Sequence, residues 1–313
     1  MNNEQITYLA FGGVLLLALV FDLGLLSKKN THITLKKALW QTALWVSLAM
    51  MFFGFMWVEN GHILAMEYLS AYLMEWSLSI DNIFVFILIF NFFGLRDKFY
   101  ARVLLIGILM AIIFRVIFIA IGIELVTRFS WLLYIFGAIL VYTGFKMFTA
   151  QNEESVDIEE NKVYKLLKKV LPLTHSDGDG KWRVTIDGKK YYTSIFVVVI
   201  MLATTDIVFA LDSIPAVFAI STHKVVIYTS NIFAVLGLRS LFFLLKGAVN
   251  KFSHLQQGIA VILVFIGVKM LIEYFHIKIP VYISLLVIVM CILASIIYSI
   301  SVANREPKNP DKE

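Results

Sequence analysis

Apolar residues in this chain gather in repeated runs that are long enough to cross a lipid bilayer. A bilayer core needs about 20 apolar residues per helical span. Hydrophobic residues make up 60% of the 313 residues and charged residues only 16%, whereas soluble domains carry about 25% charged residues. The sequence therefore predicts an all-α polytopic membrane protein with about nine transmembrane helices. The expected spans are 6–26, 38–58, 68–93, 103–123, 130–149, 194–221, 226–247, 256–275 and 280–302.

The distribution of basic residues predicts the orientation of these spans. Cytoplasmic loops are enriched in Lys and Arg. If the N-terminus lies outside, twenty of the 27 Lys and Arg residues fall in inner segments and three in outer loops. The pattern favours an N-out, C-in protein of the cell (inner) membrane, with the first run retained as a span. It also explains the net charge of +5 without a nucleic-acid partner.

The segment 150–193 is the one long hydrophilic stretch, and it is expected to be a cytoplasmic loop. It begins with acidic residues, continues with a helix-like stretch at 162–171, and reaches Asp177-Gly-Asp-Gly. That motif resembles the start of a calcium loop, but the twelfth position, which should be glutamate, is Gly188. A solvated turn into a short hairpin is the better interpretation. Protein partners, if there are any, would bind to this loop.

Two parts of the chain repeat each other. Residues 137–148 align with 260–271 without a gap, and Arg115 then falls near Arg239. Each copy contains three spans, so the second copy enters the membrane from the opposite side, as in the inverted repeats of many secondary transporters. The predicted parts are 1–67 (two N-terminal helices), 68–149 (first repeat), 150–193 (loop), 194–275 (second, inverted repeat) and 276–313 (last helix and tail).

The same alignment pairs two acidic motifs that lie in the middle of apolar spans. Glu75 corresponds to Asp206, and six residues later Asp81 corresponds to Asp212. A charge at the bilayer centre costs about 2.5–3.5 kcal/mol on insertion scales, so such residues usually face a cavity or a partner. The four carboxylates therefore predict an ion site inside the membrane.

Helix geometry extends this predicted site. Residues seven apart share a helix face, which adds Asn82 beside Glu75 and Ser213 beside Asp206, whereas the second aspartate of each motif lies about 120° away. Convergence of all four acids then requires an unwound turn or a cavity lined by two faces. Pro215 removes one backbone hydrogen bond, so we expect a helix break there.

The alternative interpretation is structural. The carboxylates could pair with Arg115 and Arg239 and simply hold the helices together. Two arginines would leave about two negative charges, which a divalent cation or two protons could balance. Either way, the arginines are expected beside the site, and Asn231 could reach it as well. No histidine or cysteine falls in mid-span within the repeats, so the available ligands are oxygen atoms, which favour Mn²⁺, Mg²⁺ or Ca²⁺.

These motifs resemble those of the TerC family of integral membrane proteins. The resemblance rests on Glu-x-x-Leu-x-x-Asp-Asn at 75–82, Asp-x-x-x-Ala-x-Asp-Ser-x-Pro-Ala at 206–216, and Asn-x-x-Ala-x-x-Gly-x-Arg at 231–239. It covers nearly the whole chain, and the length and layout resemble the Alx branch. One departure is Asp206, where the family is expected to carry glutamate more often. The resemblance implies metal homeostasis, namely Mn²⁺ export with proton exchange, with a link to tellurite resistance.

Three functions follow as hypotheses. The first is an exporter of a hard divalent cation, with metal and protons as its cargo, with no enzymatic activity and no organic cofactor. The second is a membrane scaffold or metal and stress sensor that acts through the 150–193 loop. The third is an intramembrane aspartyl hydrolase, which the sequence disfavours because no span contains a Gly-x-Gly-Asp element.

Overall fold

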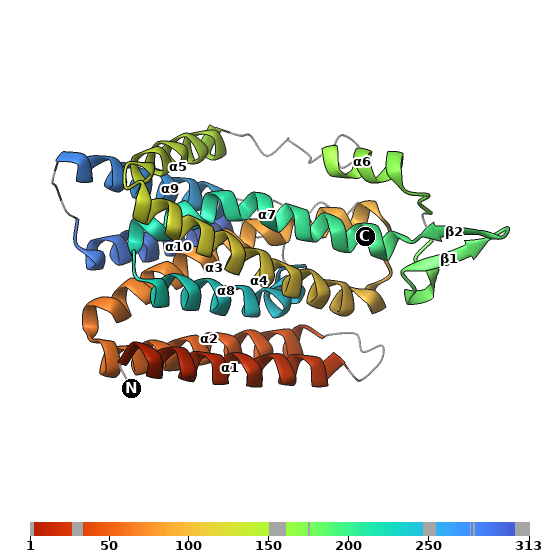
Figure 1. The fold of residues 1–313 in the computed structure, drawn as a ribbon, viewed down its shortest axis with the longest axis horizontal. Coiled ribbons are helices and arrows are strands. Elements are labelled where there is room, and N and C mark those ends of the chain that lie inside the picture. Colours follow the sequence, from red (N-terminus) through yellow and green to blue (C-terminus); the bar gives the residue numbers. More distant parts are fainter. Residues whose placement is uncertain are drawn as a thin grey trace.

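The computed structural model describes residues 3–26, 34–149, 161–174, 176–246, 255–275, 277 and 279–303. Long helices run side by side along one axis of the molecule, and a short helix and a hairpin lie at one end of the bundle (Figure 1). The long helices are α1 (Asn3–Leu26), α2 (Leu35–Asn60), α3 (His62–Phe92), α4 (Asp97–Arg128), α5 (Leu132–Thr149), α7 (Ser194–Ile220), α8 (Lys224–Lys246), α9 (Leu255–Ile272) and α10 (Val281–Ala303); the short elements are α6 (Lys162–Val170), η1 (Gly178–Gly180), β1 (Arg183–Ile186), β2 (Lys189–Tyr192) and η3 (Glu273–Phe275).

The all-α polytopic class is confirmed. In the described part of the chain, eight helices are long and apolar enough to cross a membrane, and these are α2 to α5 and α7 to α10. Helices suit a bilayer because they satisfy their backbone hydrogen bonds internally. The described apolar stretch in α1 is shorter, Gln5–Leu17, although the helix itself has 24 residues. The helix boundaries differ most in α3 and α4, which begin about six residues before the predicted spans. The orientation across the membrane stays a prediction.

α8 lies at the centre of the bundle. In the most apolar 18-residue segment of α8, 94% of the residues are buried, whereas the corresponding segments of α2 and α5 are 22% and 17% buried. α8 contacts α2, α3 and α4, so its faces are covered by protein. The apolar side chains left exposed on the outer helices, such as Met51, Ile113 and Phe145, are suited to lipid.

The two copies of the repeat are arranged as an inverted pair. α3, α4 and α5 run in directions opposite to α7, α8 and α9, to which they correspond (Figure 1). α3 packs on α8, and α4 packs on α7. Because α3 corresponds to α7 and α4 to α8, a twofold axis that relates the repeats would turn one of these contacts into the other. The remaining pair of corresponding helices, α5 and α9, pack on each other.

Glycines make the α5–α9 crossing close. A Cβ atom on Gly267 would lie 2.6 Å from the carbonyl oxygen of Gly137, and one on Gly144 would lie 2.8 Å from the carbonyl oxygen of Ala260. The sequence alignment pairs Gly137 with Ala260 and Gly144 with Gly267. The two close approaches are therefore equivalent under the repeat, and small residues at such positions are what lets membrane helices come together.

The predicted helix break at Pro215 is wrong. α7 is helical from Ser194 to Ile220, with Pro215 inside it. A proline removes one hydrogen bond, but the rest of the helix keeps its own bonds. α7 is also held from outside, because Gly122 of α4 leaves room for Ile214, directly before the proline, and for Phe218, three residues after it. Packing on α4 therefore offsets the missing bond.

The loop between the repeats folds against the bundle. Asn161 caps α6 by accepting hydrogen bonds from the amides of Val163 and Tyr164, at 2.9 and 3.3 Å. The predicted hairpin is confirmed as β1 and β2, which pair antiparallel. Its turn holds Asp187 and Gly188 at φ angles of 50° and 76°, the conformation that Asp-Gly favours in two-residue hairpin turns.

The Asp177-Gly-Asp-Gly motif attaches this loop to the start of α4. Arg96 donates two hydrogen bonds to the carboxylate of Asp177, and Lys98 donates one to Asp179 at 2.9 Å. The hydrogen bond from Arg96 lowers the pKa of Asp177, and that from Lys98 lowers the pKa of Asp179. These carboxylates therefore bind basic side chains, which gives the motif a structural role.

Asp177→Asn is expected to loosen the loop. Because the folded pKa of Asp177 lies below its unfolded value, the attraction is fully present above about pH 4 and is lost as the pH falls through the folded pKa. Amide hydrogen exchange across 176–186 at pH 7 should rise about two- to fivefold, in keeping with an exposed ion pair. Asp187→Asn at the hairpin tip is the control and should leave exchange unchanged; equal exchange in both variants and the wild type would contradict the role.

Candidate ion site

A buried arginine lies where the two repeats meet. Arg115 of α4 donates from Nη1 to Oε2 of Glu75 at 2.5 Å and to Oδ1 of Asn231 at 3.0 Å. Its Nε and Nη2 donate to the two carboxylate oxygens of Asp206, each at 3.2 Å. One guanidinium therefore joins α3, α4, α7 and α8. Glu75 and Asp206, the predicted repeat-related pair, come together through it rather than through unwound helices.

These groups are removed from solvent. Glu75 and Asn231 are 0% exposed, and Arg115 and Asp206 are 1% exposed. Bidentate contact between a guanidinium and a carboxylate is the strongest common form of charged hydrogen bond. Burying charges still costs several kcal/mol per ion, so the network depends on every charge having a partner.

The charges in this network do not balance. Two carboxylates face one guanidinium, which leaves one negative charge among the three side chains. The excess is concentrated at Glu75, because its Oε1 atom is buried and has no hydrogen-bond partner among the side chains that the structure describes. An unpartnered buried carboxylate oxygen is costly, and a proton or a cation would satisfy it.

Further buried oxygens follow the same helices. Asn82 and Ser213, both predicted, are buried on α3 and α7. Ser79 was not predicted, although it lies one helical turn after Glu75 and a four-residue spacing places it on the same face. The hydroxyls of Ser79 and Ser213 have no partner in the described part of the molecule. Each of these side chains has an oxygen atom that could bind a metal ion.

The second acid of each motif cannot be placed in the same way. The side chains of Asp81 and Asp212 lie outside the described residues, although the backbone of both is helical. Arg239 is buried on α8, two turns after Asn231, and its predicted pairing stays a prediction. Among the described side chains, no three acidic, histidine or cysteine residues gather as a metal cluster. The structure therefore shows Glu75 and Asp206 in ion pairs with Arg115.

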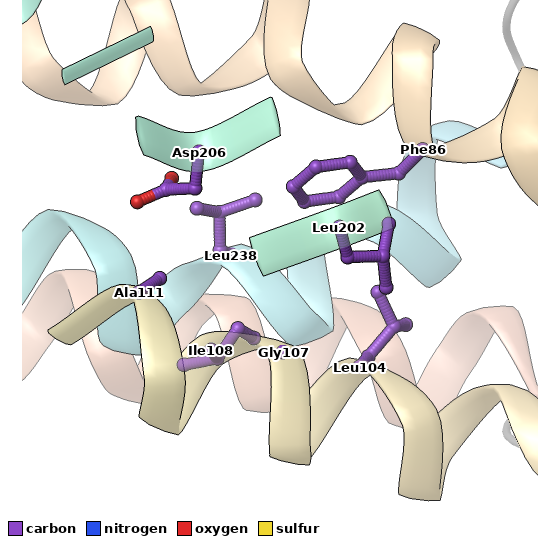
Figure 2. A pocket seen from close by; sticks show the side chains of 8 residues that line it. All are labelled: Phe86, Leu104, Gly107, Ile108, Ala111, Leu202, Asp206 and Leu238. Carbon is purple, nitrogen blue, oxygen red and sulfur yellow. The ribbon is translucent and has the colours of Figure 1, made fainter. Parts of the chain in front are cut away.

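A small cavity adjoins Asp206. It lies between α3, α4, α7 and α8 and has a volume of about 10 Å³, close to the least volume that holds one water molecule. Asp206 is the one charged residue that lines it, and Gly107 and Ala111 supply the small side of α4 (Figure 2). The cavity therefore gives space for a small polar species beside the carboxylate.

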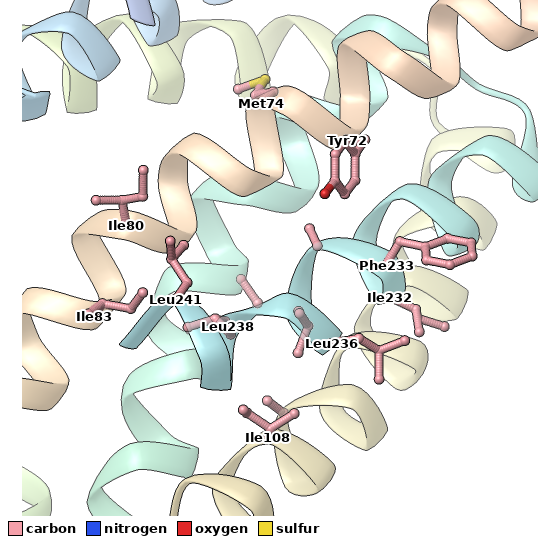
Figure 3. Packing of buried hydrophobic residues seen from close by; sticks show 14 of the residues in the cluster. Tyr72, Met74, Ile80, Ile83, Ile108, Ile232, Phe233, Leu236, Leu238 and Leu241 are labelled. Carbon is pink, nitrogen blue, oxygen red and sulfur yellow. The ribbon is translucent and has the colours of Figure 1, made fainter. Parts of the chain in front are cut away.

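Apolar side chains also pack around the network. Ile80 and Ile83 of α3, Ile108 of α4, and Leu238 and Leu241 of α8 pack around the crossing of these helices (Figure 3). A dry shell of this kind strengthens every electrostatic interaction inside it, because the local dielectric constant is low. The site is therefore sensitive to any change in its charge.

Comparison with known proteins decides the family. The profile of the integral membrane protein TerC family matches residues 60–307. This chain belongs to the TerC family. The matched region begins at the end of α2 and contains both repeats, and so it contains Arg115 and all four predicted carboxylates. No solved structure matches the chain.

Several TerC-like relatives cover almost the whole chain. An uncharacterized membrane protein, STKORF319, of Myxococcus xanthus is 42% identical over 92% of this chain and 90% of its own length. An uncharacterized membrane protein of Rickettsia felis is 41% identical over 94% of this chain and 97% of its own. A relative in Escherichia coli K12, named "Putative membrane-bound redox modulator Alx", is 39% identical over 89% of this chain and 91% of its own. The resemblance to the Alx branch agrees with this similarity.

Proposed function

We propose that this TerC-family protein exports a hard divalent cation, with Mn²⁺ the foremost candidate, across the cell (inner) membrane in exchange for protons. The observation that carries the proposal is the meeting of Glu75 and Asp206 in the membrane core with only one guanidinium between them. Intramembrane charges of this kind mark ion pathways. The excess negative charge of this pair is what a cargo cation or a proton would neutralise.

The donor atoms favour the hard class of cations. Carboxylate, amide and hydroxyl oxygens from Glu75, Asn82, Asp206 and Ser213 are buried on the two crossing helices α3 and α7. Such ligands suit Mn²⁺, Mg²⁺ and Ca²⁺ rather than zinc or copper. Mn²⁺ is placed first because the TerC resemblance implies manganese homeostasis. Asp81 and Asp212, six residues further along the same helices, would supply additional charge to the metal.

The inverted repeats supply a way to move the ion. In transporters of this architecture one repeat rocks against the other about a site near the midplane. Here Glu75 belongs to the first repeat and Asp206 to the second, so relative motion would change the distance between them. Protons entering from outside would neutralise the carboxylates and release the metal. No step of this kind requires enzymatic chemistry.

Replacing either downstream aspartate tests the proposal. In cells exposed to excess Mn²⁺, Asp81→Asn or Asp212→Asn is expected to reduce Mn²⁺ efflux by about 100-fold, the upper end of the loss caused by removing a residue that supports a metal site. The amount of each variant in the membrane fraction is the control for folding. Normal efflux by both variants would refute the proposal.

The docked loop supports the scaffold or sensor as the second candidate. α6, β1 and β2 are fixed against α3 and α4 by the Arg96–Asp177 pair and by Tyr164, which packs on Phe93, so they form an ordered surface for a partner. We do not propose a function based on an internal disulfide, because this chain has one cysteine. Deletion of 161–193 discriminates: a scaffold loses its function, whereas a transporter retains metal flux.

A further inference from the structure

The geometry points to Arg115 as an internal substitute for the cargo cation: its guanidinium and the metal ion occupy the Glu75–Asp206 pair alternately, and metal binding requires Arg115 to leave. This inference rests on the proposed function. It adds that Arg115 occupies the two carboxylates when no metal ion is bound. In the structure, three of the four oxygens of the carboxylate pair accept hydrogen bonds from Arg115. A metal ion would need the same oxygens.

The charges indicate that Arg115 and the metal ion cannot occupy the carboxylate pair at the same time. With Arg115 in place, the two carboxylates keep one negative charge, and with a divalent cation instead they become neutral. With both present, the Glu75–Asp206 pair, Arg115 and the metal ion would together carry one positive charge, and a cation a few ångströms from a guanidinium in a dry core is strongly repelled. The apolar surroundings of α3, α4 and α8 give little screening. Exchange of one cation for the other is therefore the favourable route.

Asn231 is the residue that holds Arg115 in the closed position. Its Oδ1 accepts from Nη1 of Arg115 at 3.0 Å, and its Nδ2 donates to the carbonyl of Ile227 at 3.1 Å, which fixes the amide. The offset that relates Arg115 to Arg239 places Gly107 at the position of the first repeat that corresponds to Asn231. Asn231 contributes no charge, and it can be replaced without altering the balance.

Mn²⁺ binding to the purified full-length protein in detergent tests the inference. The fraction of free Mn²⁺ is followed by its paramagnetic resonance signal, and protein stability by thermal unfolding at increasing Mn²⁺. Asn231→Leu removes the holding hydrogen bond, and the dissociation constant for Mn²⁺ should fall about three- to tenfold, the effect of one hydrogen bond. Arg115→Gln removes the competitor, and the constant should fall more than tenfold, with a larger stabilisation by Mn²⁺.

Thr229→Val is the matched control on the same helix. Thr229 is buried and its hydroxyl donates to the carbonyl of Val225 at 2.6 Å, away from Arg115, so the variant should bind Mn²⁺ as the wild type does. Unchanged or weaker Mn²⁺ binding by Asn231→Leu overturns the inference. This result decides the question even if Arg115→Gln does not fold. Loss of binding in a folded Arg115→Gln overturns the inference too, because Arg115 would then help the metal to bind. If the wild type binds no Mn²⁺ at all, it is the proposed function that fails.

Discussion

Arg115→Met is expected to lower the free energy of unfolding by about 3–5 kcal/mol in metal-free buffer, the cost of leaving buried charges without their partner. The variant would strand the carboxylates of Glu75 and Asp206 side by side in an apolar core. Methionine fills similar space, so the loss would come from charge rather than from a cavity. Thermal or denaturant unfolding in detergent micelles measures it.

Two further variants separate charge balance from simple loss of contacts. Glu75→Gln leaves Arg115 paired with Asp206 through two hydrogen bonds, a neutral pair, and should cost no more than about 1.5 kcal/mol. Arg128→Met removes an exposed pair with Glu124 on the same helix and should cost at most about 1 kcal/mol. Equal losses for Arg115→Met and Glu75→Gln would show that the charge balance described here is wrong.

Gly267→Leu is expected to produce the second large effect, a destabilisation of about 3 kcal/mol, because overpacking a tight interface forces the backbone to move. Even the first atom of the new side chain would lie 2.6 Å from the carbonyl oxygen of Gly137 and 2.8 Å from Val141. The neighbouring atoms belong to backbone as well as to side chains, so α5 and α9 must separate. The same unfolding assay in micelles measures this effect.

Gly54 of α2 provides the matched control for helix propensity. A Cβ atom there meets nothing within 4 Å, and alanine is better than glycine in a helix by about 0.5–1 kcal/mol. Gly54→Ala should therefore stabilise the protein slightly, whereas Gly267→Ala should already destabilise it. If both substitutions stabilise the protein, the close crossing of α5 and α9 does not exist.

Most of the fold could be predicted from the sequence because its causes are local. Apolar runs determine where helices lie, and the breaks between them are polar. The exception at Pro215 is instructive, since the loss of one hydrogen bond favours a break but the contacts of Phe218 and Ile214 with Gly122 do not allow one. Those contacts involve another helix, and the local sequence of α7 does not contain them.

The sequence predicts which residues belong to the site, but not how they contact one another. The repeat pairs Glu75 with Asp206 and places both in apolar spans, and this is enough to expect them together. That a single arginine would join them depends on the rotation and crossing of α3, α4 and α7, which no pattern in the chain specifies. Ser79 was missed for a related reason: it has no equivalent in the second repeat, where Ala210 stands four residues after Asp206.

Metal flux in liposomes that contain the purified protein tests whether this protein carries Mn²⁺ across a membrane. Uptake of Mn²⁺, Ca²⁺, Mg²⁺ and Zn²⁺ is compared with and without a pH gradient, using wild type, Asp81→Asn and protein-free liposomes. Mn²⁺ flux should exceed Zn²⁺ flux, increase with a proton gradient of opposite direction, and be abolished by Asp81→Asn. Flux of all four metals no faster than in protein-free liposomes, with or without the gradient, would contradict this prediction.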